Sequence, residues 1–227
     1  MRRLAIYYAP PAEAPLTREA ARWLGRDAFT GLTLEPSALN GFTRSEWQAI
    51  VADPQLYGFH ATLKPPFRIL EGVSDDQLRE RLRCFAASRR QFDAPLILGA
   101  LSRFLALVLA QPSAEFESLA ADCVRAFDEF RAPPTAEELA RRRRGRMNPA
   151  QLAYIDRWGY PYVMEEWRFH MTLTSSLGPE TFSAAWSHLA QTFEPFCREP
   201  LRIDSICLFE QPEMDAPFRV LERFDFA

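Results

Sequence analysis

Residues 57–67 read YGFHATLKPPF, and residues 167–177 read WRFHMTLTSSL. Each stretch contains the frame Phe-His-x-Thr-Leu, with its histidine at His60 in the first and at His170 in the second. The chain has three histidines in 227 residues, and two of them occupy this frame. Two such matched pairs are expected by chance in well under about one chain in a hundred. The two stretches, here termed the histidine words, therefore indicate two related half-sites.

Both histidine words are expected to form β-strands, in which successive side chains point to opposite faces. One face of each strand should then be polar, and these faces carry His60, Thr62 and Lys64 in the first word, and Arg168, His170 and Thr172 in the second. Two facing histidines can act as base and acid in one reaction near neutral pH. A threonine hydroxyl can donate to a phosphate oxygen, and a lysine or arginine can help to hold an anion.

The order of elements after the first histidine word recurs after the second. Each word is followed by one helix and two strands, expected at residues 74–90, 96–98 and 104–109, and again at 180–193, 201–209 and 218–226. A strand is also expected at residues 4–9, with helices at 16–24, 45–51 and 113–127. Two such units related by a pseudo-twofold axis would bring both words to one central cleft. The expected fold is therefore bilobal and of the α+β class.

We expect a single domain over residues 1–227, with lobe one at about 1–131, a helical insertion at about 132–166, and lobe two at about 167–227. An aromatic turn, Gly-Tyr-Pro-Tyr at residues 159–162, closes the insertion just before the second histidine word. Tyr160 in this turn could stack on a sugar or a base of a ligand, or pack in a core beneath the insertion.

Residues 141–146 read RRRRGR, and two interpretations are open for this run. It could be a solvated helix end that pairs with Glu137 and Glu138 one turn earlier. It could instead contact several phosphates of a ligand or an RNA.

Net charge, the length of apolar runs and the motifs that the sequence lacks count against several classes of function. The formal net charge of -3 disfavours a general nucleic-acid binder, and no apolar run is long enough for a signal peptide or a membrane span. The sequence contains no HExxH motif, no cysteine pair of zinc-site spacing and no Walker phosphate loop. We therefore expect a cytoplasmic protein that needs no metal and no cofactor. The four cysteines are interpreted as buried free thiols, and the third histidine, His188, as structural.

The paired words resemble the H-x-T-x signature of the two-histidine (2H) phosphoesterase superfamily, in its LigT-like form. The segments YGFHATLKPPF, RWGYPYV and RFHMTLT are more closely similar to a branch of that superfamily encoded beside phosphonate-utilisation (C–P lyase) genes. The resemblance implies two lobes of antiparallel sheet plus helix with the site between them. It also implies that His60 and His170 are the general acid and base, in an order left open. Thr62 and Thr172 would bind the phosphate, without a metal.

The sequence thus predicts a hydrolase of the phosphoesterase class that acts on a cyclic phosphate or phosphodiester. Its substrate would be a small metabolite, in phosphonate metabolism for example, or an RNA end. The candidate substrate-binding residues are Thr62, Thr172, Lys64, Arg168 and Tyr160. The main alternative is a non-catalytic protein that binds a phosphorylated ligand or RNA in the same cleft, and a third is a purely structural pseudo-symmetric protein. We expect a monomer with no membrane partner.

Overall fold

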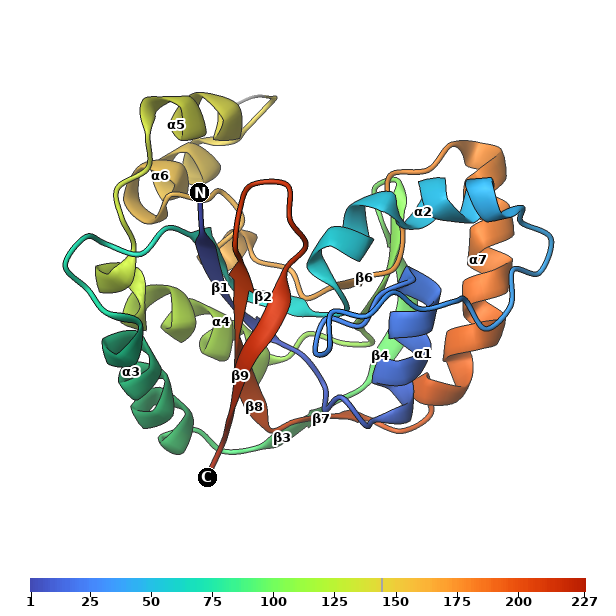
Figure 1. Cartoon of the computed structure of the whole chain (residues 1–227), viewed down its shortest axis with the longest axis horizontal. Coiled ribbons are helices and arrows are strands. Elements are labelled where there is room, and N and C mark those ends of the chain that lie inside the picture. The colour runs from blue at the N-terminus through green and yellow to red at the C-terminus, as the bar shows by residue number, and fades with distance from the viewer. Residues whose placement is uncertain (144) are drawn as a thin grey trace.

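The computed structural model describes residues 1–143 and 145–227 (Figure 1). Within these residues, seven strands form one sheet in the order β4-β5-β6-β2-β1-β8-β9. Every neighbouring pair of strands in this sheet is antiparallel. The strands are β1 (Arg3–Tyr8), β2 (Ala61–Phe67), β4 (Leu96–Leu101), β5 (Phe104–Leu109), β6 (Met171–Thr172), β8 (Ser205–Gln211) and β9 (Arg219–Asp225). The expected α+β class is confirmed.

The strand order is symmetric about the boundary between β2 and β6. These strands carry the two histidine words and lie side by side, with Ala61 paired to Met171. Outward from them, β1 corresponds to β5 and β8 to β4. Two short strands outside this sheet, β3 (Phe92–Ala94) and β7 (Leu201–Ile203), pair with each other. The pseudo-twofold axis therefore passes between the two histidine words, as expected from the repeated element order.

The two repeats do not coincide with the lobes expected at 1–131 and 167–227. Strand β1 pairs with β8 from the far end of the chain, and β4 pairs with β5. One repeat therefore runs from β1 to β4 and the other from β5 to β8. The last strand of each repeat lies in the other repeat's half of the sheet. Sequence patterns do not reveal this exchange, because it depends on pairing between strands that are distant in sequence.

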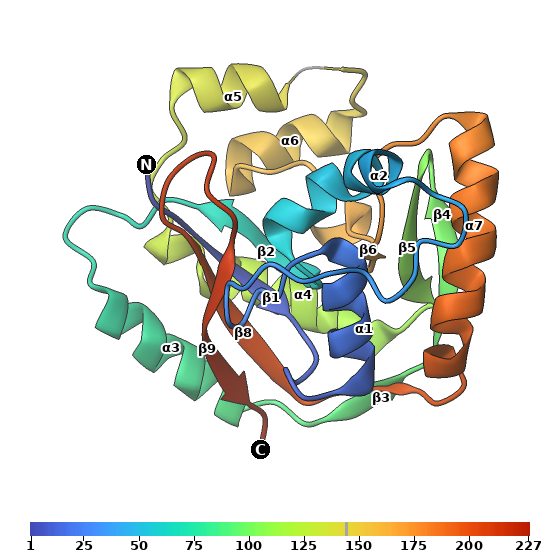
Figure 2. The same cartoon turned by 45° about the vertical axis from the view of Figure 1, so that its right-hand side comes forward.

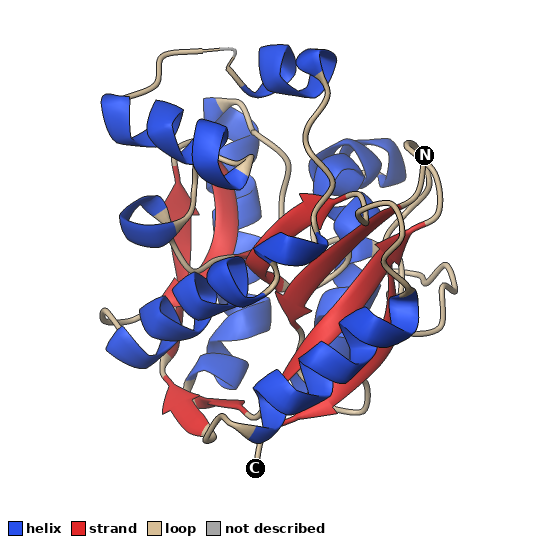
Figure 3. Ribbon diagram, turned by 90° about the vertical axis from the view of Figure 1, so that its left-hand side faces the viewer, coloured by secondary structure: helices blue, strands red, loops and turns tan. Residues whose placement is uncertain are grey.

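Amphipathic helices cover the sheet. Helices α3 (Asp75–Ala87) and α4 (Ala114–Ala126) pack on the half that contains β1, β2, β8 and β9, where Figure 3 shows helices crossing in front of the strands. Helices α1 (Pro15–Leu24) and α7 (Pro179–Phe193) lie along the other half (Figure 2). In α1, Trp23 donates a hydrogen bond of 2.8 Å to the carbonyl of Leu173 in the second histidine word. This bond fixes the second word against the helical layer.

The alternation of side chains along β1 separates two apolar clusters. Leu4, Ile6 and Tyr8 belong to the large core beneath the helices. Tyr7 points to the other face, where it belongs to a smaller cluster with Phe209 and Phe218. The sheet therefore has apolar packing on both faces near its centre, and the smaller cluster forms the floor beneath the first histidine word.

The predicted helical insertion has a counterpart in the other repeat. Helices α5 (Ala136–Arg142) and α6 (Pro149–Trp158) stand between α4 and the second histidine word, at one end of the molecule (Figure 2). In the first repeat, α2 (Arg44–Tyr57) occupies the equivalent place between α1 and the first word. Capping boxes at Thr135 and Asn148 begin α5 and α6, and each satisfies backbone N–H groups that the first helical turn leaves free.

Short 3-10 turns complete the fold at η1 (Asp128–Phe130), η2 (Met164–Glu166) and η3 (Glu194–Cys197). Across the described residues, no helix is both long enough and apolar enough to cross a bilayer. The cysteines are free, but only Cys123 and Cys207 are buried, while Cys84 is exposed on α3 and Cys197 is partly exposed. The expectation that all four thiols are buried is therefore wrong, because polar neighbours on α3 place Cys84 on its solvent face.

Candidate active site

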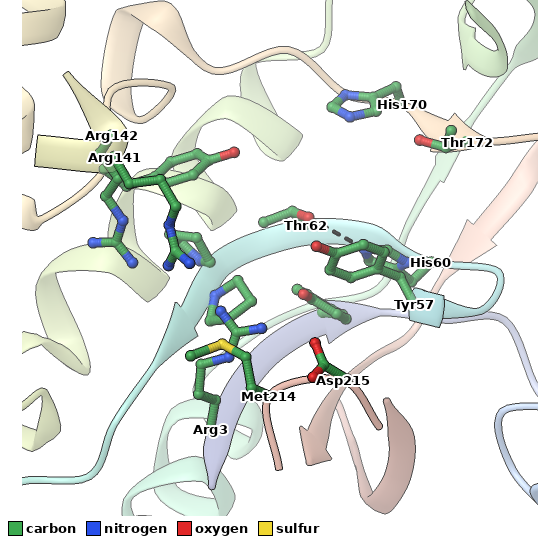
Figure 4. A pocket seen from close by; sticks show the side chains of 14 residues that line it. Arg3, Tyr57, His60, Thr62, Arg141, Arg142, His170, Thr172, Met214 and Asp215 are labelled. Atoms are coloured by element: carbon green, nitrogen blue, oxygen red, sulfur yellow. Dashed lines mark hydrogen bonds between the residues drawn. The ribbon is translucent and has the colours of Figure 1, made fainter. Parts of the chain in front are cut away.

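The sheet carries a cleft of about 580 Å³ on the face of the histidine words (Figure 4). Side chains from both repeats and from the β8–β9 connection line it: Arg3, Tyr7, Tyr57, His60, Thr62, Pro65, Pro66, Arg141, Arg142, Tyr160, His170, Thr172, Met214 and Asp215. Both histidines and both threonines predicted from the sequence are therefore brought together in one cleft. Their convergence argues against a purely structural pseudo-symmetric protein.

Pairing across the two central strands places each histidine opposite the threonine of the other word. Ala61 and Met171 are direct partners on antiparallel strands, and both are fully buried. The residues that flank this pair lie on the opposite face of the sheet, toward the cleft. His60 then faces Thr172, and Thr62 faces His170. Two segments 110 residues apart thus form one quartet around the pseudo-twofold axis.

The ring of each histidine is fixed by the same backbone contact. His60 Nδ1 lies 3.0 Å from the carbonyl oxygen of Gly58, and His170 Nδ1 lies 2.8 Å from that of Arg168. A carbonyl oxygen can only accept, so each Nδ1 carries the proton and donates it. In the neutral ring, Nε2 is then an unprotonated acceptor, as a general base requires. The His60 Nε2 lies 3.3 Å from the hydroxyl oxygen of Thr62, which can donate to it.

The shape of the turn between α2 and β2 requires a glycine at Gly58. Its φ of 78° lies in a region that side chains rarely adopt, and an added Cβ would lie 2.6 Å from the Cβ of Ala28. This turn aims the Gly58 carbonyl at the His60 ring. Glycine therefore serves both the close approach to Ala28 and the orientation of the histidine.

Aromatic rings enclose His60. The Tyr7 ring stacks on it at 3.9 Å between centroids, and the Tyr57 ring lies near it at 6.1 Å. Burial, against the opposing Gly58 hydrogen bond and with a smaller contribution from the nearby His170, lowers the pKa of His60 to about 4. His60 is therefore neutral at pH 7. Tyr57 also stacks on Phe218 at 5.2 Å and lines the cleft.

His170 has a different neighbourhood. Ala106 of β5 occupies the place beside Thr172 that Tyr7 of β1 occupies beside Thr62. The nearest aromatic ring to His170 is instead that of Phe104, tilted at 5.8 Å. Burial again lowers the pKa of His170, and the hydrogen bond to the Arg168 carbonyl opposes the shift. The pseudo-twofold symmetry of the backbone is thus broken by the side chains.

Lys64 does not lie in the cleft, although the sequence placed it with His60 and Thr62. Strand β2 pairs Tyr7 with Thr62 but Ile6 with Lys64, so an extra residue, Leu63, bulges between them. The bulge turns Lys64 to the face of the large core. There its ammonium donates to the Val124 carbonyl at 3.2 Å and pairs with Asp128 at 3.3 Å, and the side chain is 2 % exposed.

We expect Lys64→Met to leave kcat/KM unchanged within about twofold, since the side chain does not reach the cleft. Stability should be little changed at neutral pH or raised, because a hydrophobic residue replaces a buried ion pair and Arg131 still pairs with Asp128 at 2.7 Å.

Burial lowers the Lys64 pKa from 10.5 to about 8. Between these pH values the unfolded chain therefore binds more protons. The free energy of unfolding of the wild type should rise with pH there, relative to the variant. Denaturant titrations would measure this free energy of unfolding in both proteins. A loss of activity above tenfold in Lys64→Met would contradict the placement of Lys64 outside the cleft.

Arg168 also lies outside the cleft. Strand β6 begins only at Met171, so strand alternation does not extend back to Arg168. Its guanidinium donates to the backbone carbonyls of Glu165 and Trp167 at 2.8 and 2.7 Å, and the side chain is exposed beside α4. What Arg168 supplies to the site is its own carbonyl oxygen, which accepts from His170.

Tyr160 lines the cleft from the turn that follows α6, as one of its two sequence interpretations required. Its ring meets that of Tyr162 edge to face at 5.7 Å, and burial raises its pKa to about 12. The phenol is therefore protonated at any working pH and is available as a hydrogen-bond donor.

The arginine run divides between surface and cleft. Arg143 pairs with Asp156 on the surface, whereas Arg141 and Arg142 line the cleft. Glu138 forms its ion pair with Arg68 at 3.2 Å rather than with the run. The expected pairing of the run with Glu137 and Glu138 is therefore not observed in the described residues, and Arg144 lies outside them.

His188 has the structural place expected from its sequence. It is buried on α7, where its ring packs on Trp23 at 4.8 Å and its Nδ1 lies 3.0 Å from the Asn40 amide nitrogen. In the described parts of the chain, no three His, Cys, Asp or Glu side chains gather as a metal site would need.

Beyond Tyr57, Pro65 and Pro66 of the first histidine word, four further residues of the cleft were not predicted: Arg3, Tyr7, Met214 and Asp215. They come from β1 and from the β8–β9 connection, and no motif marks them. Only the pairing of β1 with β2 and β8 brings them beside the histidine words.

Comparison with solved structures gives similar proteins over the full chain. E. coli LigT complexed with 3′-AMP is 15% identical with a TM-score of 0.45, and a phosphoesterase is 14% identical with a TM-score of 0.46. Each comparison covers 100% of this chain and 98% of the other. At these identities and TM-scores the likeness carries no conclusion about activity.

Two curated relatives share more sequence. The chain is 37% identical over 235 residues to "Ribose 1,5-bisphosphate phosphokinase PhnN" of Janthinobacterium sp. (strain Marseille), and 32% identical over 220 residues to the protein of that name of Laribacter hongkongensis (strain HLHK9). These matches cover 100% and 96% of this chain, but 51% and 50% of the relatives. The chain thus spans about half of their length. The model of a family described as "Protein of unknown function (DUF1045)" matches residues 62–219, from Thr62 of the first histidine word through the whole of the second, and the chain belongs to that family.

Proposed function

We propose that this chain is a phosphoesterase that opens a cyclic phosphodiester by two-histidine acid–base catalysis. The carrying observation is the quartet of His60, Thr62, His170 and Thr172 around the axis between β2 and β6. Displacement at phosphorus is in line, with the attacking and leaving oxygens on opposite sides. Two proton-transfer groups on neighbouring strands, one on each side of an axis, suit that requirement.

The reaction balances with water as the second substrate. One histidine takes a proton from the water through its Nε2, and the water oxygen bonds to phosphorus. The bond from phosphorus to one ring oxygen breaks, and the other histidine gives its proton to that oxygen. The product is a phosphate monoester with a free hydroxyl. The threonine hydroxyls donate to the phosphate oxygens, where negative charge is held.

We assign the base to His60 and the acid to His170 in the hydrolytic direction. The low pKa of His60, about 4, keeps its Nε2 unprotonated over the working range of pH. Its ring is held between tyrosines and its Nδ1 proton is committed to the Gly58 carbonyl. His170 must then be protonated when substrate is bound, which the negative phosphate favours by attraction.

This assignment predicts an acidic pH optimum for kcat/KM. The acid must be protonated in the free enzyme, and burial holds the His170 pKa below its ordinary 6.5. We therefore expect kcat/KM to fall with rising pH, with the midpoint of its alkaline limb below 6.5. The alkaline limb of kcat should lie at higher pH, because bound phosphate stabilises the imidazolium. Initial rates from pH 4 to 9 on a cyclic phosphodiester, which does not itself titrate there, would measure both. An alkaline limb of kcat/KM above pH 7.5 would contradict it.

This proposal does not assign to this chain the kinase activity named in the curated relatives. The chain has no Walker phosphate loop and matches only about half of each relative. We infer that the phosphokinase activity belongs to the half that this chain does not match. The curated relatives are named for a ribose phosphate substrate, and this favours a ribose phosphate as the small metabolite. That choice is compatible with the phosphonate-pathway role suggested by the sequence resemblance.

The test is an assay in EDTA on a ribose cyclic phosphate, a nucleoside 2′,3′-cyclic phosphate and an RNA with a cyclic end. Phosphorus NMR would identify the expected monoester, and reaction in ¹⁸O-labelled water would place one label on it. Turnover in EDTA supports the proposal. Tight binding of one member with no turnover of any would instead support the non-catalytic binder.

A further inference from the structure

We propose that the cleft holds a second phosphate group at its arginine end, so that the substrate is a small sugar carrying a cyclic phosphodiester and a separate phosphate monoester. This inference rests on the proposed function, whose quartet occupies the other end of the cleft. Figure 4 shows Arg3, Arg141 and Arg142 on one side, and both histidines with Thr172 on the other. The two ends differ in chemistry, and the reaction uses only one of them.

The arginine end is positively charged without compensation by ion pairs. None of the ion pairs found in residues 1–143 and 145–227 involves Arg3, Arg141 or Arg142, although each neighbour, Arg2 and Arg143, has a carboxylate partner. Burial and the neighbouring Arg141 lower the pKa of Arg142, although the charge of Glu138 opposes the shift, so guanidinium groups at this end of the cleft repel each other. Such an arrangement is stabilised by a bound anion.

Two of these arginines are held in place by neutral acceptors. Arg142 donates to the carbonyl of Gly159, at the left-handed turn that ends α6. Arg3 donates through Nε to the side-chain oxygen of Gln211 at 2.7 Å. Each contact uses one N–H group and leaves others of the fork available for phosphate oxygens. The positions are therefore built by the fold rather than left to flexible surface side chains.

The rest of the cleft suits a sugar between the two phosphates. Asp215 is the one carboxylate among the described lining residues, and it can accept hydrogen bonds from sugar hydroxyls while repelling phosphate. Tyr160 supplies a protonated phenol to the same cleft. A volume of about 580 Å³ falls within the usual range for small-molecule sites. A polynucleotide would present further phosphates beyond the three arginines, so a compact sugar phosphate is the better match.

The experiment compares ribose cyclic phosphates with and without a phosphate on carbon 5, each as the 1,2- and the 2,3-cyclic isomer. We expect kcat/KM to favour the phosphorylated member of a pair by about 10²-fold, since several charge-assisted hydrogen bonds are added. Arg142→Gln should lower this ratio about tenfold, and Arg3→Gln with Arg142→Gln should bring it close to one. Arg143→Gln is the matched control, because Arg143 pairs with Asp156 on the surface, and it should keep the wild-type ratio.

The outcomes separate this inference from the proposed function. Equal kcat/KM for both members overturns the second phosphate site and leaves the phosphoesterase standing. If neither member is turned over, calorimetry would measure the binding of the same compounds, and the result would decide whether the second phosphate site exists. Tighter binding of the phosphorylated member that is lost in Arg142→Gln supports the site and counts against the esterase, whereas equal binding overturns the site as well.

Discussion

Replacing His60 or His170 by alanine is expected to lower kcat at least about 10³-fold, because each variant removes one of the two proton transfers. Neither loss can be compensated by the other histidine, since base and acid act on different oxygens at the same phosphorus. Glutamine at either position fills much of the space of the ring but cannot exchange a proton in this pH range, so it should be equally inactive. Single-turnover rates on a ribose cyclic phosphate would measure the effect.

A matched control is available in the third histidine. His188→Gln removes a buried ring that packs on Trp23 from α7, outside the residues that line the cleft. It should lower the free energy of unfolding while leaving kcat within about twofold of wild type. Circular dichroism melts of all variants would show whether the cleft variants remain folded. Retained turnover in folded His60→Ala and His170→Ala would falsify the two-histidine mechanism.

Replacing Thr62 or Thr172 by valine should lower kcat about 10²-fold, the usual effect of removing one fixed donor to a developing anion. Valine keeps the shape of threonine and its strand preference, so the loss measures the hydroxyl. His60 faces Thr172 and Thr62 faces His170 across the two strands, and the Thr62 hydroxyl also lies 3.3 Å from His60 Nε2, so both threonines belong to one quartet. The double variant should lose less than the product of the single losses, as for residues that act as one unit.

Thr192→Val is the control for this pair. Thr192 lies on α7 and donates to the carbonyl of His188 at 2.9 Å, so its hydroxyl has a local partner outside the cleft. Rates and substrate affinity should both match wild type. If Thr62→Val and Thr172→Val change KM but leave kcat intact, the hydroxyls bind ground state and transition state equally, and their proposed part in charge stabilisation is lost.

Side-chain differences between the repeats explain why two similar words need not perform identical roles. Tyr7 and Ala106 occupy equivalent places beside the two threonines, so only His60 has an aromatic ring stacked against it. Gly58 and Arg168 present equivalent carbonyls, but only the first lies in a glycine-dependent turn. One backbone frame therefore places two imidazoles in unlike surroundings, as separate base and acid require.

Local patterns in the amino-acid sequence were enough to predict most elements and the residues expected at the centre of the site. Repetition of Phe-His-x-Thr-Leu points to His60, Thr62, His170 and Thr172 from the sequence alone, and strand alternation puts each pair on one face. Most helices and strands followed from apolar periodicity, because period and composition are local properties. The α+β class followed from the order of those elements.

Which other side chains lie beside these residues depends on how the strands pair in the folded chain. Alternation assigned Lys64 to the cleft, but the bulge at Leu63 turned it into the core, and one inserted residue reverses every later face in a strand. The pairing of β1 with β2 and β8 places Tyr7 and Asp215 in the cleft. Such pairings join segments far apart in the chain, and their energy depends on packing across the whole sheet. A local pattern therefore predicts the candidate groups, while the assembled sheet determines what surrounds them.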